Sequence, residues 1–489
     1  MMRQSIRFLR RGQLVEIGSL AAMHTLLDYL RLEEKSKGTK EGCNEGDCGA
    51  CTVALGSLEN GKLVYEPVNA CILLLGQIDG KELVTIDDLA ASGKLHPVQK
   101  AFVDNHASQC GFCTPGFVMS LFTLYHAGKK PTRQEIVDHI AGNLCRCTGY
   151  RAIVDAAAKS CSGKPADAWS AAAGKTAQHL ATLADGADVL VGDDSSFFAA
   201  PATQEALVQL YIAHPDATII AGATDVGLWI TKQLRRLPKI IYIGRVRGLD
   251  AIVDHNTHLS IGATATYADA APYLASIDGD IAEVIRRIGA KQVRASGTLG
   301  GNIANGSPIG DSPPMLIALG ATLHLRRGEN QRSLALEDFF VGYGKQDRAA
   351  SELIWRVDVP RLKSNEVFRS YKLSKRFDQD ISAVMSAFKF TLDGRTIAAA
   401  RIAFGGMAAT PKRAARTELA LRGVSLDQPQ EWQPAMGAMA EDYQPIGDMR
   451  ASAIYRLESA CGLLRKALME VASGQSKLTR IVGVRGEAA

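Results

Sequence analysis

The sequence of 489 residues has little net charge, no long apolar run and no secretory leader. It holds 56 Lys and Arg against 51 Asp and Glu, which gives a formal net charge of +5. So small an excess indicates neither nucleic-acid binding nor attachment to a charged membrane surface. The longest apolar runs are far too short to span a bilayer. The lack of a signal peptide predicts a cytoplasmic protein, in which disulfides are rare.

Eight of the ten cysteines fall into two tight sets near the N-terminus. The first set has three cysteines spaced C-x4-C-x2-C and one more distant, and its members are Cys43, Cys48, Cys51 and Cys71. This is the ligand spacing of plant-type [2Fe–2S] clusters. Gly46 and Gly49 lie within the loop, where positive φ angles would let backbone N–H groups approach sulfur. The spacing therefore predicts an iron–sulfur centre.

The second set reads C-x2-C and then C-x-C, and its members are Cys110, Cys113, Cys145 and Cys147. An apolar helical run, 117–122, follows the first pair. Thr132 and Glu135 form a capping-box pattern that opens a helix leading toward the second pair. Two helical hairpins that present four thiols at one end fit a small bundle around a second cluster.

Zinc and disulfides are the alternatives for both sets. Zinc sites usually pair two C-x2-C knuckles, whereas the first set has three clustered cysteines and one distant one. For Cys161 and Cys461, which belong to neither set, we expect structural roles as buried thiols. His96, His106, His126 and His139 are scattered on helical segments, where core or surface roles are expected. No general acid or base is predicted.

Two Gly-, Ser-, Thr- and Asn-rich segments, 222–227 and 294–308, follow later in the chain. Neither reads G-x-G-x-x-G, so a Rossmann fold is not supported. Such segments are commonly plain turns, but consecutive backbone N–H groups in them can also form an anion-binding nest. The pyrophosphate of a dinucleotide is the guest that we expect. The basic pair Lys412 and Arg413 is expected to lie in a solvated loop.

The motifs QCGFCTPG (109–116) and NLCRCTGYR (143–151) resemble the iron–sulfur part of the molybdenum hydroxylase family, in particular its bacterial xanthine dehydrogenase branch. The resemblance implies an α+β multidomain chain. Its expected parts are a β-grasp, ferredoxin-like [2Fe–2S] domain (1–90), a four-helix [2Fe–2S] domain (91–163), a linker (164–195), a VAO/PCMH-type FAD-binding α+β domain (196–372) and a C-terminal α+β flavoprotein domain (373–489). It also implies that Gln109 lies at the edge of a pterin.

The same resemblance assigns the two cysteine sets to two [2Fe–2S] clusters and the Gly-rich segments to FAD. The segments would cradle the diphosphate and ribose, and Asp311 would lie toward the adenosine. The residues implied for FAD are Ile219, Ile220, Ala221, Gly222, Ala223, Thr224, Asp225, Val226, Ile288, Thr298, Gly301, Asn302, Asn305, Ser307, Asp311, Ile354 and Lys372.

No molybdopterin-binding region follows the flavin domain, so we expect molybdenum on a partner subunit, in an (αβ)2 heterotetramer without nucleic acid or membrane. The implied activity is electron transfer from that molybdopterin centre through both clusters to FAD and then NAD+, in support of purine oxidation to urate. Three alternatives remain: another molybdenum hydroxylase that acts on an aldehyde, nicotinate or carbon monoxide, a standalone NAD(P)H-dependent iron–sulfur flavoprotein reductase, and a zinc-stabilised scaffold.

Overall fold

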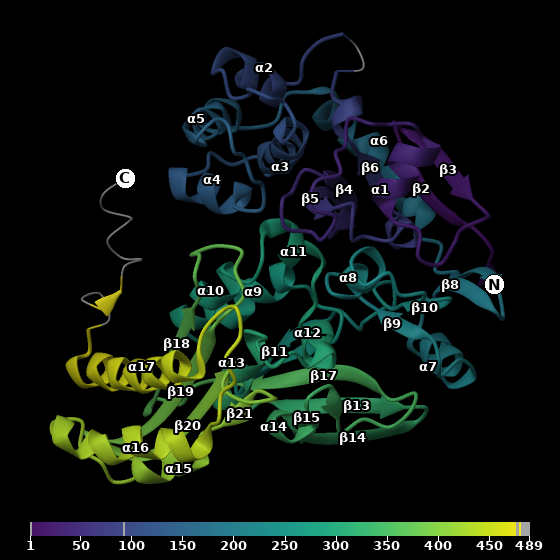
Figure 1. Cartoon of the computed structure of the whole chain (residues 1–489). Coiled ribbons are helices and arrows are strands. Elements are labelled where there is room, and N and C mark those ends of the chain that lie inside the picture. The colour runs from purple at the N-terminus through teal and green to yellow at the C-terminus, as the bar shows by residue number, and fades with distance from the viewer. Residues whose placement is uncertain (1, 91–92, 476–478, 481–489) are drawn as a thin grey trace. The chain divides into compact units, whose positions relative to one another are not determined.

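The computed structural model describes residues 2–90, 93–475 and 479–480. The chain forms two compact units, each with its own sheets and core. The first unit holds Met1–Arg247 and Gly289–Gly297, and the second holds Gly248–Ile288 and Thr298–Ala489. Figure 1 colours the chain from purple at the N-terminus to yellow at the C-terminus.

A five-stranded sheet opens the first unit, with strand order β3-β2-β6-β4-β5. Asn60 and Gly61, both with positive φ, make the two-residue turn between the hairpin strands β4 and β5. One short helix, α1 (Leu26–Asp28), continues as the π-helix η1 (Tyr29–Glu33) and buries its leucines against the sheet. The strands are β2 (Ile6–Arg10), β3 (Gln13–Ile17), β4 (Thr52–Glu59), β5 (Lys62–Asn69) and β6 (Glu82–Val84). This sheet and helix agree with the expected ferredoxin-like domain.

Four helices follow, as the cysteine-bearing hairpins predict. The central helix α3 is buried along most of its length, because its sequence is apolar on every side. Thr132 and Glu135 form the predicted capping box at the start of α4. The elements are the 3-10 turns η2 (Leu75–Ile78) and η3 (Ile86–Asp88) and the helices α2 (Pro97–Asp104), α3 (Thr114–His126), α4 (Arg133–Ile140) and α5 (Arg151–Ser160).

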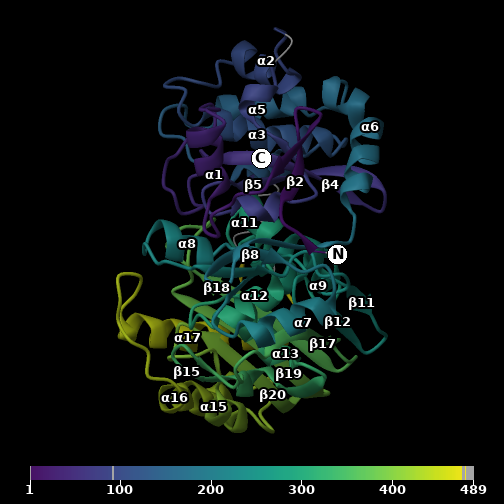
Figure 2. The same cartoon turned by 90° about the vertical axis from the view of Figure 1, so that its right-hand side faces the viewer.

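The segment expected to be a linker, 164–195, holds the long helix α6 (Ala168–Leu183) and the strand β7 (Asp188–Asp193). The sequence indicates helix only around 177–183, but the helix starts earlier because Asp167 caps it by accepting a hydrogen bond from the Ser170 N–H. Leu180 and Leu183 pack against Leu9 of the ferredoxin-like sheet, and Figure 2 shows α6 running beside that sheet.

The rest of the first unit lies mostly at the start of the predicted flavin domain (196–372), joined by β1 from the N-terminus and by β7. A second sheet has the order β1-β7-β8-β10-β9, and Phe198 of β8 packs tightly against Gly76. This sheet and the ferredoxin-like sheet therefore share one hydrophobic core. The elements are β1 (Met2–Arg3), β8 (Ser196–Ala200), α7 (Gln204–Ala213), β9 (Thr218–Ile220), α8 (Val226–Thr231), β10 (Lys239–Tyr242) and α11 (Lys291–Ser296).

The second unit is built on two larger sheets, β11-β12-β17-β13-β14 and β18-β19-β20-β21, and a small pair, β15-β16. Its strands are β11 (Ile252–Asp254), β12 (His258–Gly262), β13 (Thr322–Arg327), β14 (Asn330–Ala335), β15 (Phe340–Gly342), β16 (Lys345–Gln346), β17 (Leu353–Pro360), β18 (Glu366–Leu373), β19 (Val384–Asp393), β20 (Thr396–Gly405) and β21 (Lys412–Arg413).

Helices cover the sheets of the second unit. Phe388, Phe404 and Trp432 belong to the core between the four-stranded sheet and the C-terminal helices. The helices are α9 (Tyr267–Ala275), α10 (Gly279–Arg286), α12 (Leu299–Asn305), α13 (Ser312–Leu319), α14 (Leu336–Phe339), α15 (Ala415–Ala420), η4 (Pro429–Trp432), α16 (Gln433–Asp442) and α17 (Ala453–Ser473). Among all the helices of the described ranges, none combines the length and apolar character that a membrane span requires.

Candidate iron–sulfur and flavin sites

The first cysteine set lies in the first unit as two pairs. The thiols of Cys43 and Cys48 share a hydrogen bond, and the Sγ atoms of Cys51 and Cys71 are 3.2 Å apart. Cys51 and Cys71 are buried, whereas Cys43 and Cys48 are half-buried. The positive φ of Gly46 and of Gly49 allows the sharp turns of this loop.

Backbone N–H groups of the loop point at sulfur, as the sequence predicts. The Cys43 N–H donates to Cys48 Sγ (3.2 Å), and the N–H groups of Asp47 and Cys48 donate to Cys43 Sγ (3.4 and 3.3 Å). The Cys48 thiol and these N–H groups lower the pKa of Cys43 to about 5, although burial opposes the change. The same hydrogen bond raises the pKa of the Cys48 thiol, so only Cys43 of this pair favours the thiolate form that binds metal.

The second set also forms two pairs, Cys110 with Cys147 and Cys113 with Cys145. Burial raises the pKa of Cys145, but hydrogen bonds from Thr148 outweigh it, and the net pKa of that thiol is lowered. Cys110 and Cys147 are exposed, so this set opens onto the surface of its unit.

The pairing of each set distinguishes a two-iron cluster from zinc. Tetrahedral zinc with Zn–S bonds of 2.3 Å would hold all four sulfurs about 3.8 Å apart. Across the described ranges, no three cysteine sulfurs lie within 4.8 Å of one another. A two-iron cluster instead takes two thiolates on each iron. Both sets therefore fit a [2Fe–2S] cluster, and the predicted ligands are brought together as expected.

The two cysteine loops contact each other directly. The Leu144 N–H, one residue before Cys145, donates to the Cys48 carbonyl oxygen at 3.0 Å. Gly116 and Gly49 lie so close that a Cβ on Gly116 would be 2.1 Å from the Gly49 oxygen. A single hydrogen bond therefore joins Cys48 of the first set to Leu144, the residue before Cys145 of the second set.

Gln292 of α11, which the sequence analysis does not single out, completes this junction. Its Nε2 atom lies 3.1 Å from Asn143 Oδ1 and 3.2 Å from both Ser120 Oγ and Thr52 Oγ1. The Asn143 amide in turn donates to the Gly49 carbonyl at 3.1 Å. No local pattern could reveal Gln292, because these partners are 149 to 240 positions away in the sequence.

In the first unit, the FAD segment predicted over 219–226 runs from β9 through a tight loop into α8. Gly222 is required there, since a Cβ would lie 1.9 Å from the Ser296 carbonyl oxygen. Ala223 has a positive φ of 56°. The Gln77 side chain donates to the Ala221 carbonyl at 2.9 Å, which ties this loop to the segment that follows Cys71. The loop is therefore a rigid backbone turn.

The other residues predicted for FAD lie in the second unit. Thr298 caps α12 by accepting from the Gly301 N–H at 3.0 Å. The Lys372 ammonium pairs with the Asp311 carboxylate at 2.6 Å, with both side chains largely buried. Gly301 and Asn305 are exposed, and Asn302 lies within α12. Ser307 follows the end of α12, Ile354 is buried in β17, and Ile288 follows α10. The structure brings Asp311 and Lys372 together, and contacts with FAD remain predictions.

A third cluster, His96, His126 and Asp167, has ligand atoms within 4.8 Å of one another. The imidazole Nε2 atoms of His96 and His126 lie 2.7 and 2.9 Å from Asp167 Oδ2. His96 Nδ1 accepts the Val98 N–H at 3.2 Å, so its proton is on Nε2. A metal on Nε2 would need that proton on Nδ1, against the Val98 N–H. The cluster is therefore a hydrogen-bonded anchor for α6.

Three family models match this chain. They describe a [2Fe-2S] binding domain over 85–158, the FAD binding domain in molybdopterin dehydrogenase over 194–362, and the CO dehydrogenase flavoprotein C-terminal domain over 369–471. The matches agree with the expected α+β multidomain fold and with the iron–sulfur and flavin cofactors.

Curated relatives of the chain include xanthine dehydrogenases. The protein of Blastobotrys adeninivorans is 30% identical over 482 residues, covering 78% of this chain and 34% of its own length. That of Emericella nidulans is 29% identical over 528 residues, covering 96% of this chain and 39% of its own length. The chain thus spans little more than a third of these relatives.

Solved structures that resemble the chain include a Cu,Mo-CO dehydrogenase, with a TM-score of 0.53 and 26% identity over 56% of this chain and 97% of that chain. Quinoline 2-oxidoreductase from Pseudomonas putida 86 has a TM-score of 0.52 and is 27% identical. The match covers 56% of this chain and 96% of that chain. These findings define an oxidoreductase with iron–sulfur and flavin domains. The chain is a homologue of xanthine dehydrogenases and of carbon monoxide dehydrogenase.

Proposed function

We propose that this chain is the electron-transfer subunit of an NAD-dependent xanthine dehydrogenase. Its partner subunit would carry molybdopterin and oxidise hypoxanthine and xanthine to urate, and this chain would deliver the electrons to NAD+. The observation that carries the proposal is the hydrogen bond between the Leu144 N–H and the Cys48 carbonyl, which connects the two cysteine loops. When bound, the clusters supply one-electron transfer and FAD links it to two-electron chemistry.

The exposure of the second cysteine set supports a partner on that side. Phe112, Leu144 and Tyr150 beside it are 49%, 41% and 37% exposed. Apolar side chains gathered around exposed thiols are typical of a surface that another protein covers. The half-buried first set, by contrast, is tied through the Gln77 side chain to the predicted flavin loop. The proposed order of carriers is thus second set, first set, flavin.

The coverage of the relatives favours the xanthine dehydrogenase type. A single xanthine dehydrogenase chain aligns with 96% of this chain. The CO dehydrogenase chain is matched over 97% of its own length, and that match covers only 56% of this chain. Iron–sulfur and flavin domains in one chain therefore point to the first type. A role in another molybdenum hydroxylase is the second candidate, supported by the C-terminal family model.

Purification of the complex from its native source tests the proposal. We expect about four irons and one FAD per chain, with molybdenum on a co-purifying polypeptide. Xanthine should then drive NADH formation, whereas aldehydes, nicotinate and carbon monoxide should not. Zinc in place of iron, or absence of flavin, would contradict the relay. Activity with carbon monoxide alone would replace the xanthine assignment with the second candidate.

A further inference from the structure

Lys232 lies outside the cysteine loops but contacts Cys43, a predicted cluster ligand. Lys232 follows the last turn of α8, and its ammonium donates a hydrogen bond to the Cys43 carbonyl oxygen. The same ammonium lies 3.6 Å from the Glu45 carboxylate, which belongs to the loop between Cys43 and Cys48. A positive charge and its counter-charge are therefore both placed at the half-exposed pair of the first cysteine set.

The helix that carries Lys232 is held firmly against the same set. A Cβ on Gly227 of α8 would lie 2.7 Å from the Ile72 carbonyl oxygen, and Ile72 directly follows Cys71. At its other end, α8 continues the predicted flavin loop, whose Ala221 carbonyl accepts from Gln77. The position of the ammonium is thus defined, because α8 contacts the segment after Cys71 and Lys232, directly after the helix, bonds the Cys43 carbonyl.

The electrostatic effect of this arrangement has a definite sign. A cluster held by four thiolates is anionic, and reduction adds one more negative charge. A nearby ammonium stabilises the reduced form more than the oxidised form, and a nearby carboxylate does the opposite. The side chains of Lys232 and Glu45 are 41% and 42% exposed, so water and salt weaken both effects without removing them.

We propose that Lys232 tunes the reduction potential of the first cluster by fixing an ammonium on the backbone of Cys43, with Glu45 as the opposing charge. The proposal rests on the proposed function, since it requires a [2Fe–2S] cluster on the first set. Lys232 is a positioning and tuning residue: it binds the peptide of a ligand, and its charge favours the electron on the first cluster.

A redox titration of the purified complex with sodium dithionite, followed by electron paramagnetic resonance, tests this proposal. In Lys232→Met, the ratio of reduced to oxidised first cluster at a fixed ambient potential should fall about two- to tenfold, where tenfold equals 59 mV for one electron. Lys232→Arg keeps the charge and should restore the wild-type value. The second cluster serves as an internal reference and should not shift.

Two further variants control for general effects. Arg236→Met removes an exposed cation four residues away and should leave both potentials unchanged. Glu45→Gln removes the opposing charge and should raise the first potential, opposite to Lys232→Met. An unshifted first cluster in Lys232→Met, or the same shift in Arg236→Met, would overturn the proposal.

The Lys232→Met variant could lose its first cluster, and Glu45→Gln then tests the proposal alone. If the reduction potential of the first cluster does not rise in Glu45→Gln, the proposal is wrong. Failure of the proposed function looks different from failure of this inference. If the chain holds no [2Fe–2S] clusters, the wild-type complex shows no pair of [2Fe–2S] signals. If only the substrate assignment is wrong, both signals remain while xanthine fails to drive NADH formation.

Discussion

At the scale of single residues, the pKa of each cysteine thiol depends on the groups that surround it. Cys43 receives N–H groups from its own loop, and its pKa falls to about 5, chiefly through the Cys48 thiol. For Cys113, burial and the hydrogen bond with the Cys145 thiol raise the pKa to about 12, and a backbone hydrogen bond lowers it only in part. The spacing of the cysteines predicts which thiols gather. Which thiols pair, and how the pKa of each thiol shifts, depends on the three-dimensional positions of the cysteines. Their spacing in the sequence does not give those positions.

Gly116 gives a prediction at this scale. Its replacement by alanine places a methyl group 2.1 Å from the Gly49 carbonyl oxygen, a backbone atom that cannot move without shifting the loop between Cys48 and Cys51. We expect Gly116→Ala to lower the free energy of unfolding by about 1–3 kcal/mol. Thermal unfolding of the complex and the signal of the first cluster are the measurements.

Gly174→Ala in α6 is the matched control, because no atom lies within 4 Å of its Cβ position. Alanine is the better helix former by about 0.5–1 kcal/mol, so this variant should be as stable as the wild type or more so. Equal melting temperatures for the two variants would show that the two cysteine loops do not pack as closely as described.

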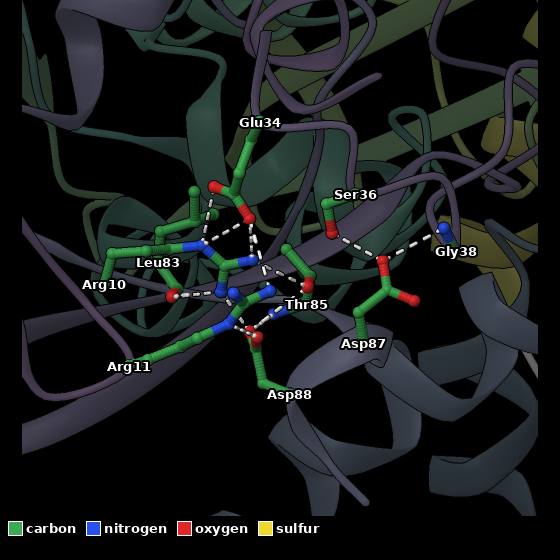
Figure 3. A network of polar contacts seen from close by, with 9 residues as sticks. All are labelled: Arg10, Arg11, Glu34, Ser36, Gly38, Leu83, Thr85, Asp87 and Asp88. Carbon is green, nitrogen blue, oxygen red and sulfur yellow. Dashed lines mark hydrogen bonds and ion pairs between the residues drawn. The ribbon is translucent and has the colours of Figure 1, made fainter. Parts of the chain in front are cut away.

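At the scale of elements, a buried ion-pair network holds the start of the first cysteine loop. Figure 3 shows Arg10 of β2 between Glu34 and Asp88, with Nη2 2.6 Å from Glu34 Oε1. Nearby, the Asp87 carboxylate accepts from the Gly38 N–H at 3.0 Å and from Ser36 Oγ. The segment that leads to Cys43 is therefore fastened to β2 and to the loop after β6.

Removing the cation at the centre of this network should be costly. Arg10→Met removes the buried cation between Asp88 and Glu34 and leaves them only the exposed guanidinium of Arg11, so the free energy of unfolding should fall by about 3 kcal/mol. We expect a lower melting temperature and less iron in the first cluster. Lys100→Met, in an exposed pair with Asp104, should change stability by less than about 1 kcal/mol. Similar losses in both variants would contradict the role of the network.

Element predictions were most successful where local chemistry decides the outcome. The capping box of Thr132 and Glu135 starts α4 as expected. The early start of α6 was missed, because it depends on the Asp167 cap, whose carboxylate is held by His96 and His126 from distant helices.

At the scale of the whole molecule, the order of carriers can be tested by removing one ligand. Cys147→Ser should prevent assembly of the second cluster, because Cys147 and Cys110 form one of its two pairs. Xanthine-driven NADH formation should fall at least about 100-fold, while NADH still reduces FAD at the wild-type rate. Stopped-flow flavin reduction and steady-state assays on the complex measure the two rates.

Cys461→Ser is the control for this variant. Cys461 is a half-buried thiol of the second unit, and its Sγ donates to the Met436 carbonyl at 3.5 Å. A serine hydroxyl can keep that bond, so iron content and both rates should remain. If Cys147→Ser lost both rates equally while retaining FAD, the proposed order of carriers would be wrong.

The cysteine spacings, the Gly-rich segments and the caps are local patterns, so the sequence alone was enough to predict iron–sulfur and flavin cofactors. The tertiary structure alone decided how these parts meet. Gln292 reaches partners up to 240 positions away, Asp311 meets Lys372, and Lys232 reaches Cys43 across 189 positions. Such contacts arise when the sheets and helices pack their apolar faces together. Periodicity along the sequence predicts only the contacts between residues close together in the chain.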